Sequence, residues 1–243
     1  MKEKYKIIIH NTFDEEVKKQ WLEVENRNRS SITIFQTFDW QHNWFKYIGN
    51  KIGSMAIFIV TKYDNEDCKL IIPMFLKKTF FLNILEFSGY PFSDFNLPIS
   101  DKDFDSFDID EIFRLISKKK ISNKKIDLIH LKNQPEQTNQ NKNLFFDLNS
   151  FIKTEIIQSY KINTKNYTEA NILDQKKLKF LKQDFTRIEK KVSDIEFVIS
   201  SDKNEKNMII DYIISKKSDQ YDRNNSWNFF KKKNYRNFIK SFL

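Results

Sequence analysis

Apolar side chains recur at intervals of three and four residues along several segments of the chain, which is the spacing of one face of an α-helix. The pattern is strongest over residues 174–192, where Leu178, Leu181, Phe185 and Ile188 fall on one face. The same reasoning predicts helices over residues 14–26, 110–119 and 206–217, and one that begins at residue 235.

Short runs rich in β-branched and aromatic residues, separated by polar turns, predict β-strands. The clearest case is a hairpin in which residues 55–63 and 69–76 flank the polar turn at residues 64–67. Further strands are expected over residues 6–10, 80–87, 125–131, 154–162 and 195–199, and loops over 91–98 and 133–143. Strands mixed with helices around this hairpin predict an α/β fold of the mixed α+β kind, with a central, mostly antiparallel mixed sheet flanked by helices.

Composition limits the class of protein. The chain has 243 residues, 40% of them hydrophobic, which is enough for one large domain or two small ones and excludes a disordered polymer. A net charge of +9 allows attraction to anionic partners. Cys68 is the single cysteine, so no disulfide can form within the chain, and no apolar run reaches the length of a membrane span. A cytoplasmic location is therefore expected.

One ten-residue stretch, FQTFDWQHNW at 35–44, combines four aromatic rings with three polar side chains suited to chemistry. Thr37 is placed to cap a helix over this stretch. Trp40 and Trp44 then lie on the apolar face of that helix, with Tyr47 one turn further on.

Four segments together resemble the CelD-like acetyltransferases, tandem GNAT-fold proteins often tied to bacterial polysaccharide or envelope biosynthesis. FQTFDWQHNW is similar to an aromatic helix of that family, and IIPM at 71–74 resembles a strand that ends in an apolar-Pro-Leu pattern. LEFSGYPFSDFNLP at 85–98 resembles its Gly…Asp-Tyr…Pro loop, with Phe95 in place of the usual tyrosine. KKLKFLKQDFTRIEKKV at 176–192 is similar to its basic helix, and the match spans most of residues 30–243.

The resemblance implies a first GNAT-like half over residues 1–165, followed over 166–243 by the basic helix and the start of an incomplete second half. It also implies transfer of an acyl group from acetyl-CoA or another acyl-CoA to an amine or hydroxyl of a sugar or envelope precursor. A pyrophosphate is usually held by backbone N–H groups at a Gly-rich helix start. The chain has only three glycines, so it is expected to lack the complete donor site and to need a further half.

By resemblance alone, one set of residues is expected to bind the acceptor. These are Gln36, Trp40, Trp44, Asp94 and Phe95.

The candidate catalytic residues are Asp94, Asp39 and His42, and each has a structural alternative. Asp94 lies in a loop, where it can act on a substrate or form an Asx turn. Asp39 stands in a first helical turn, where a carboxylate is favoured by the helix dipole. His42 has the intrinsic pKa of a general base, but helical spacing places it off the aromatic stripe, on the polar face. His130 is interpreted as a core-side or cross-strand residue, and no metal-ligand spacing is present.

The basic helix supports a second hypothesis. Lys179, Lys182 and Arg187 are candidates for holding the phosphates of a cofactor. Alternatively, residues 176–191 and 231–236 form a non-catalytic basic module that binds nucleic acid or an anionic surface. A tandem GNAT transferase that uses aminoacyl-tRNA is a third alternative. For the acyltransferase, nucleic acid is not an expected partner.

Overall fold

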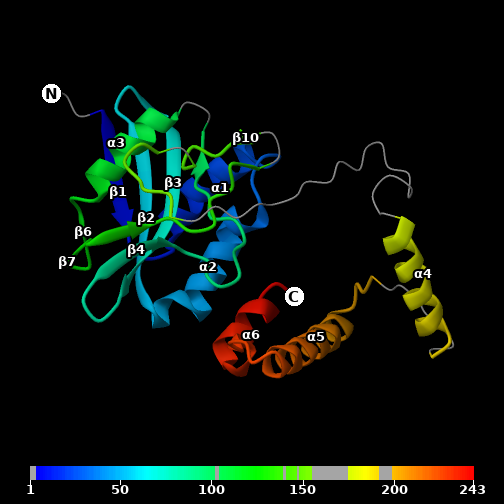
Figure 1. Ribbon diagram of the computed structural model, residues 1–243. Coiled ribbons are helices and arrows are strands. Elements are labelled where there is room, and N and C mark those ends of the chain that lie inside the picture. Colours follow the sequence, from blue (N-terminus) through cyan, green and yellow to red (C-terminus); the bar gives the residue numbers. More distant parts are fainter. Residues whose placement is uncertain (1–3, 102–103, 139–140, 147, 155–174, 192–198) are drawn as a thin grey trace. The chain divides into compact units, whose positions relative to one another are not determined.

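The computed structural model describes residues 4–101, 104–138, 141–146, 148–154, 175–191 and 199–243 (Figure 1). The chain divides into two compact units. One comprises residues 1–151 together with 209–243, and the other comprises residues 152–208. The predicted boundary at residue 165 lies outside the described residues.

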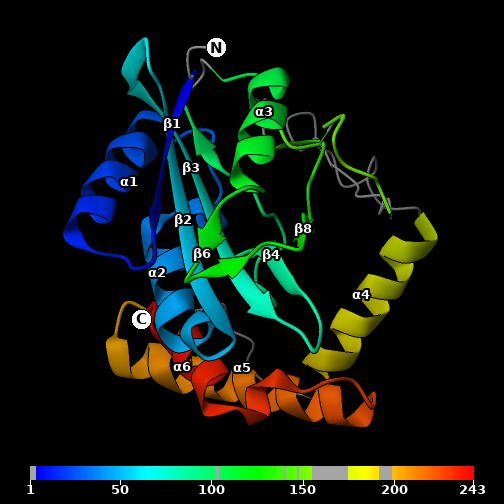
Figure 2. The ribbon, with the colours of Figure 1, turned by 90° about the vertical axis from the view of Figure 1, so that its left-hand side faces the viewer.

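A mixed sheet forms the centre of the first unit (Figures 1 and 2). Its strand order is β1-β2-β3-β4-β8, and every neighbouring pair is antiparallel except β4 and β8, which are parallel. The expectation of a mostly antiparallel mixed sheet flanked by helices is therefore confirmed. The strands are β1 Tyr5–His10, β2 Gly53–Lys62, β3 Asn65–Lys78, β4 Asn83–Phe87 and β8 Leu128–His130, with the short β5 Ile99–Ser100 paired to β3.

Both faces of the sheet are covered, because the side chains of a strand alternate between the faces and both sets are apolar in β2. Met55, Ile57 and Ile59 share one core with α1 Glu15–Arg27 and α2 Phe38–Tyr47. Ala56, Phe58 and Val60 share the other core with α3 Ser106–Ile116. Figure 2 shows α1 and α3 on opposite sides of the strands.

The helices begin where side chains satisfy their free backbone N–H groups. Thr37 accepts a hydrogen bond from the backbone of Trp40 at 3.3 Å, which confirms the predicted cap of α2. The helix predicted over residues 110–119 instead runs from Ser106 to Ile116. It starts earlier because Asp105 and Asp108 form a reciprocal capping box, in which Asp105 accepts from the Asp108 backbone at 2.8 Å.

Two predicted strands are shorter than expected. Residues 80–82 of the predicted strand 80–87 belong to a turn, because the Thr79 backbone and hydroxyl both donate to the Leu82 carbonyl. The predicted strand 125–131 is broken into β7 Lys124–Lys125 and β8. Strand β7 pairs instead with β6 Lys120–Ile121 across a turn at residues 122 and 123, both of which have positive φ angles. Within the predicted loop 133–143, β9 Gln137–Thr138 and β10 Asn141–Lys142 pair antiparallel.

The C-terminal segment returns to the first unit. Helix α5 Lys203–Arg223 is longer than the predicted 206–217, and it is followed by the 3-10 turn Phe229–Lys231 (η4) and by α6 Lys233–Lys240. Further 3-10 turns, η1 Ile34–Gln36 and η2 Gly49–Lys51, flank α2. Phe238 of α6 is fully buried and its ring lies edge-on to Trp40 at 5.1 Å. The aromatic face of α2 is therefore covered by the end of the chain.

In the second unit, α4 Gln175–Glu189 confirms the predicted amphipathic helix. The predicted strands 154–162 and 195–199 lie almost wholly outside the described residues. Across the described helices, no segment is both long enough and apolar enough to span a bilayer.

Candidate functional site

A polar cluster of Glu86, His130 and Lys132 lies at the carboxyl ends of β4 and β8. Glu86 and His130 are paired in the parallel register of these two strands. The Glu86 Oε1 atom lies 3.4 Å from His130 Nδ1 and 3.3 Å from Lys132 Nζ. Glu86 is buried, whereas the side chains of His130 and Lys132 are 41% and 44% exposed. The cluster thus places an accessible imidazole and ammonium over a buried carboxylate.

The strand geometry explains the position of Glu86. Its neighbours Leu85 and Phe87 point into the core beneath α3. Because successive side chains alternate, Glu86 points to the other face, on which α2 and α6 lie. The sequence interpretation overlooked Glu86, although a single carboxylate between two apolar strand residues just before a loop was a usable signal.

A turn beside the cluster starts at Gly89, which has a φ of 120°. The Gly89 carbonyl accepts hydrogen bonds from the backbones of Phe92 and Ser93 at 2.9 and 3.0 Å. A Cβ at position 89 would overlap the side chain of Ser93. Glycine is therefore required here both by its φ angle and by the close approach of Ser93.

The loop at residues 88–98 is joined to the segment that follows β8. Asn133 donates from Nδ2 to the Ser93 carbonyl at 3.0 Å, and its own carbonyl accepts from the Asn96 backbone at 3.0 Å. The Lys132 ammonium also lies 5.7 Å from the centre of the Tyr90 ring. These contacts hold the loop next to the polar cluster.

The aromatic helix supports the same loop. Trp40 Nε1 donates to the Ser93 hydroxyl at 3.0 Å, and Trp44 Nε1 donates to the Tyr90 carbonyl at 2.8 Å. Gln36 Nε2 donates to the Pro98 carbonyl at 2.6 Å. The structure thus brings together the two sequence motifs. The side-chain N–H groups of Gln36, Trp40 and Trp44, which were predicted to bind the acceptor, thus donate hydrogen bonds within the chain.

Three other predicted site residues of this unit are exposed: Asp39, Asp94 and Phe95. Asp94 and Phe95 are exposed on the loop, and the Phe95 ring lies edge-on to Phe35 at 6.2 Å. Asp39 is exposed in the first turn of α2. Asp94 and Phe95 are thus the predicted acceptor-binding residues that remain open to a ligand.

His42 is not on an open polar face as expected. Its ring stacks on Phe38 and lies 5.5 Å from Phe13, which precedes α1 and covers this side of α2. Burial, followed by the charge of Lys46, lowers the pKa of His42. His42 is therefore half-buried against the rings of Phe13 and Phe38.

The phosphate candidates belong to the other unit. Lys179, Lys182 and Arg187 are exposed on α4, and Arg187 pairs with Asp184 at 3.1 Å. In the first unit, the starts of α1, α2 and α3 are capped by the side chains of Asp14, Thr37 and Asp105. These three helix starts therefore offer little to a phosphate.

Asp108 forms a second charged cluster, which the sequence interpretation missed. Its carboxylate accepts from Lys4 at 2.7 Å and from the Tyr5 hydroxyl, and it pairs with Lys62 at 2.9 Å. Burial alone would raise the pKa of Asp108, but the hydrogen bonds from Lys4, Tyr5 and Lys62 outweigh it and hold this pKa well below its usual range. Burial and the bond to Asp108 raise the pKa of Tyr5 to about 12. This cluster joins α3 to β1 and β2.

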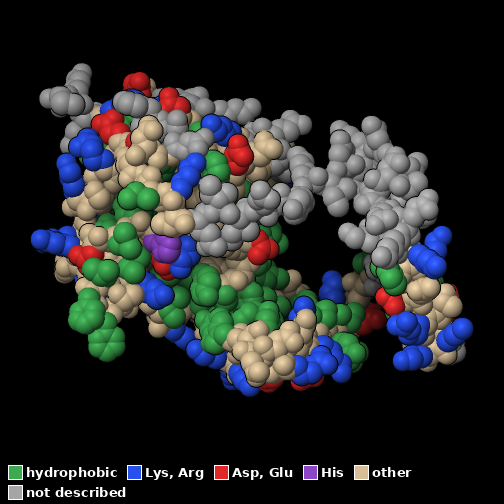
Figure 3. Space-filling model, viewed as in Figure 1, with side chains coloured by type: hydrophobic (Ala, Val, Ile, Leu, Met, Phe, Trp, Pro, Cys, Tyr) green, Lys and Arg blue, Asp and Glu red, His purple; other side chains and the backbone are tan. Residues whose placement is uncertain are grey.

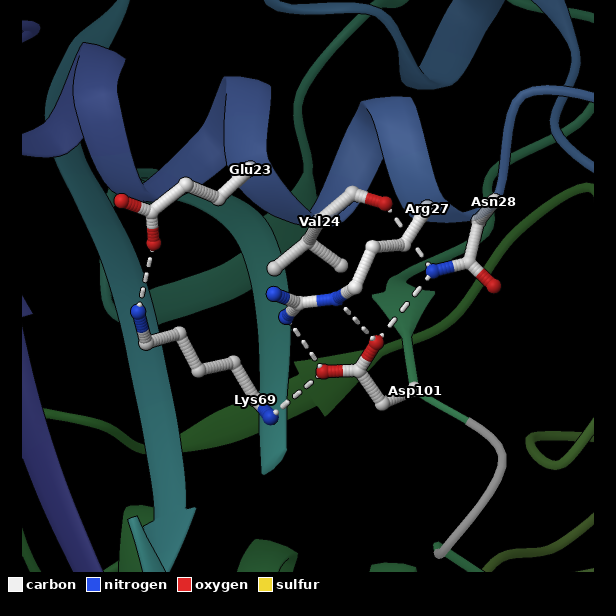
Figure 4. A network of polar contacts seen from close by, with 6 residues as sticks. All are labelled: Glu23, Val24, Arg27, Asn28, Lys69 and Asp101. Atoms are coloured by element: carbon white, nitrogen blue, oxygen red, sulfur yellow. Dashed lines mark hydrogen bonds and ion pairs between the residues drawn. The ribbon is translucent and has the colours of Figure 1, made fainter. Parts of the chain in front are cut away.

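A third charged group connects α1 with β3 and β5 (Figure 4). Arg27 donates from Nε and Nη2 to the two carboxylate oxygens of Asp101, at 3.1 and 2.7 Å. The Lys69 backbone N–H also donates to Asp101 at 2.9 Å, while the Lys69 ammonium pairs with Glu23 at 2.9 Å. Because these groups satisfy one another, the arrangement is structural.

In the described part of the chain, no group of three or more His, Cys, Asp or Glu residues is placed to hold a metal ion. The side chain of Cys68 lies outside the described residues. Comparison of the chain with known protein families, with curated proteins and with solved structures gave no match.

Proposed function

We propose that this chain provides the acceptor side of a GNAT-like acyltransferase, in which His130 is the general base. The observation that carries the proposal is the contact between the buried Glu86 carboxylate and the accessible His130 imidazole, 3.4 Å apart. A carboxylate that orients a histidine and stabilises its charged form is a recurring arrangement for proton transfer.

The chemistry follows from which ring nitrogen faces the carboxylate. Nδ1 of His130 faces the Glu86 carboxylate, so Nε2 is the ring nitrogen proposed to accept a proton. Nε2 accepts the proton of an amine or hydroxyl as that group attacks the carbonyl carbon of a thioester. The carbon–sulfur bond then breaks, and coenzyme A leaves as a thiolate. Glu86 faces the positive charge that forms on the ring, and Lys132 pairs with the same carboxylate oxygen.

The donor and acceptor classes come from the resemblance to CelD-like proteins, which implies an acyl-CoA donor and a sugar or envelope precursor as acceptor. The loop at residues 88–98 is suited to a sugar, because exposed rings and an exposed carboxylate stand together on it. These residues are Tyr90, Asp94 and Phe95. Ring faces pack on the apolar side of a sugar, and carboxylates accept hydrogen bonds from its hydroxyl groups.

The test measures release of free thiol from acetyl-CoA in the presence of amino sugars and neutral sugars. Even without a complete donor site, we expect slow release above the protein-free rate, because His130 still activates the acceptor. H130Q should return the release to the protein-free rate, since general-base catalysis contributes about 10²–10⁴-fold. E86Q should lower kcat and leave KM for the acceptor little changed. H42Q serves as the matched control. It should leave the rate unchanged, because the His42 ring is packed against Phe13 and Phe38.

Two results would overturn the proposal. The first is thiol release in the unmodified chain that does not exceed the protein-free rate. The second is thiol release that H130Q leaves unaltered. Release with aminoacyl-tRNA as donor, and none with acetyl-CoA, would instead assign the chain to the tRNA-dependent transferases.

A second candidate is a basic module that binds nucleic acid. The exposed lysines of α4 favour it, since Lys179 and Lys182 lie on a helix whose described side chains are mostly open to solvent, and the exposed Lys190 follows directly after it. Binding to a generic duplex should fall steeply as salt rises, because released counterions drive such binding. No measurable binding at low salt would exclude this candidate.

A further inference from the structure

The turn between β3 and β4 exposes two consecutive phenylalanines. Phe80 and Phe81 are 96% and 90% exposed, and Leu82 beside them is exposed as well. The turn is closed by hydrogen bonds in which Thr79 donates to the Leu82 carbonyl at 2.9 Å and Leu82 donates to the Thr79 hydroxyl at 3.2 Å. Apolar side chains project at the lower left of Figure 3, where Figure 1 draws this hairpin.

The composition of this tip is unusual for a tight turn. The central positions of such turns normally hold Gly, Asn, Asp or Pro, and here both are phenylalanine. Lys77 and Lys78 precede the turn, and residues 75–85 contain no acidic residue. The tip therefore combines a large apolar surface with local positive charge.

The tip is held by a regular ladder. Lys77 pairs with Ile84 and Lys78 pairs with Asn83 in the antiparallel register. Asn83 is held in turn by the Asp127 carboxylate, which accepts from its backbone at 2.7 Å and from its side chain at 3.1 Å. Because β3 and β4 are already paired next to the turn, the two rings are held in place before binding. Binding therefore does not carry the entropy cost of ordering this part of the chain.

We propose that this hairpin tip docks the protein on an anionic lipid surface, with Phe80, Phe81 and Leu82 entering the interfacial layer. Aromatic rings favour the level of the lipid headgroups, and lysines near the surface are attracted by anionic lipids. A protein partner fits less well, because two rings bury roughly 400 Å² whereas a stable interface covers about 800 Å² on each side. The proposal is independent of the proposed acyl transfer and of α4.

The test is sedimentation of the full chain with vesicles of phosphatidylcholine containing about 30% phosphatidylglycerol. We expect the double variant F80S/F81S to bind at least about tenfold more weakly, since burying one phenylalanine corresponds to a factor of roughly ten or more. Replacing Lys77 and Lys78 by Gln in the unmodified chain should also weaken binding to the vesicles. This effect should be larger at low salt than at high salt. I152S is the matched control, because Ile152 is also 90% exposed but lies outside the tip.

Several outcomes would overturn the proposal. Equal binding of the unmodified chain and F80S/F81S would do so, as would a complete lack of binding to the anionic vesicles. Light scattering after gel filtration tests whether the tip instead joins two copies of the chain. If the unmodified chain is a dimer and F80S/F81S is a monomer, and neither binds vesicles, the tip is a self-association surface and the lipid assignment is wrong.

Discussion

The indole N–H of Trp40 donates to the hydroxyl of Ser93 at 3.0 Å, which joins two motifs that stand 53 positions apart in the chain. Trp40 is buried against Phe238 of α6 on its other side. The aromatic helix is therefore the support of the loop at residues 88–98. The exposed residues of that loop and the half-exposed His130 above the buried Glu86 make up the candidate site.

Removing this hydrogen bond should destabilise the protein. Trp40→Phe leaves the buried Ser93 hydroxyl without its donor, so we expect the free energy of unfolding to fall by about 1–3 kcal/mol. Urea unfolding followed by circular dichroism measures the change. Trp227→Phe, at a half-exposed indole, should change the free energy of unfolding by less than about 0.5 kcal/mol. Similar losses in both variants would show that the bond to Ser93 has no special role.

The ion pair between Arg27 and Asp101 should contribute through its geometry as well as its charge. Arg27→Lys keeps the charge but cannot make two parallel hydrogen bonds, so a loss of about 1 kcal/mol is expected. Asp101→Ala should cost more, about 2 kcal/mol, because Asn28 and the Lys69 backbone also lose their acceptor. Thermal unfolding of the two variants checks this order. An Arg27→Lys variant as stable as the unmodified protein would contradict it.

The Asp108 cluster predicts a loss of stability in acid. The pKa of Asp108 is lower in the folded protein than in the unfolded chain, so the unfolded chain binds the proton first as pH falls. The stabilisation is complete above the ordinary carboxyl pKa of about 4 and is lost progressively below it. The measured free energy of unfolding should therefore decrease as the pH is lowered below about 4.

Asp108→Asn provides the corresponding comparison. It should lower stability at neutral pH by about 3 kcal/mol, since it leaves Lys4 and Lys62 without their carboxylate. It should also reduce the slope of stability against pH in acid. Asp64→Asn, at an exposed carboxylate in the turn between β2 and β3, is the control and should preserve that slope. An unchanged slope in Asp108→Asn would rule out Asp108 as its source.

His42 should show its burial in its titration. Because burial lowers the pKa of His42, its proton NMR signals should titrate below pH 6.5, the ordinary value for the side chain. The unfolded chain then binds the proton more readily, so this residue makes stability decrease as pH falls below that value. His42→Phe should remove that part of the decrease. A His42 titration at or above the ordinary value would contradict the packing against Phe13 and Phe38.

Local patterns were sufficient for the elements whose signals lie within a few residues. The hairpin of β2 and β3, the helix capped by Thr37 and the amphipathic α4 are all of this kind. The start of α3 depends on a capping box, and the hairpin of β6 and β7 depends on two residues with positive φ angles. The spacing of apolar residues does not indicate either feature. The strand predicted from residue 80 failed because Phe80 and Phe81 look like strand residues and instead occupy a turn.

The sequence by itself determined the mixed fold and the two motifs that meet at the loop, because hydrophobic period and capping chemistry act between neighbours along the chain. Only the tertiary structure decided which polar residues come together in the candidate site. Glu86 and His130 lie 44 positions apart and come together because β4 and β8 pair in parallel, with Glu86 opposite His130. A change of one residue in that register would turn the two side chains to opposite faces, so no local pattern could have revealed their contact.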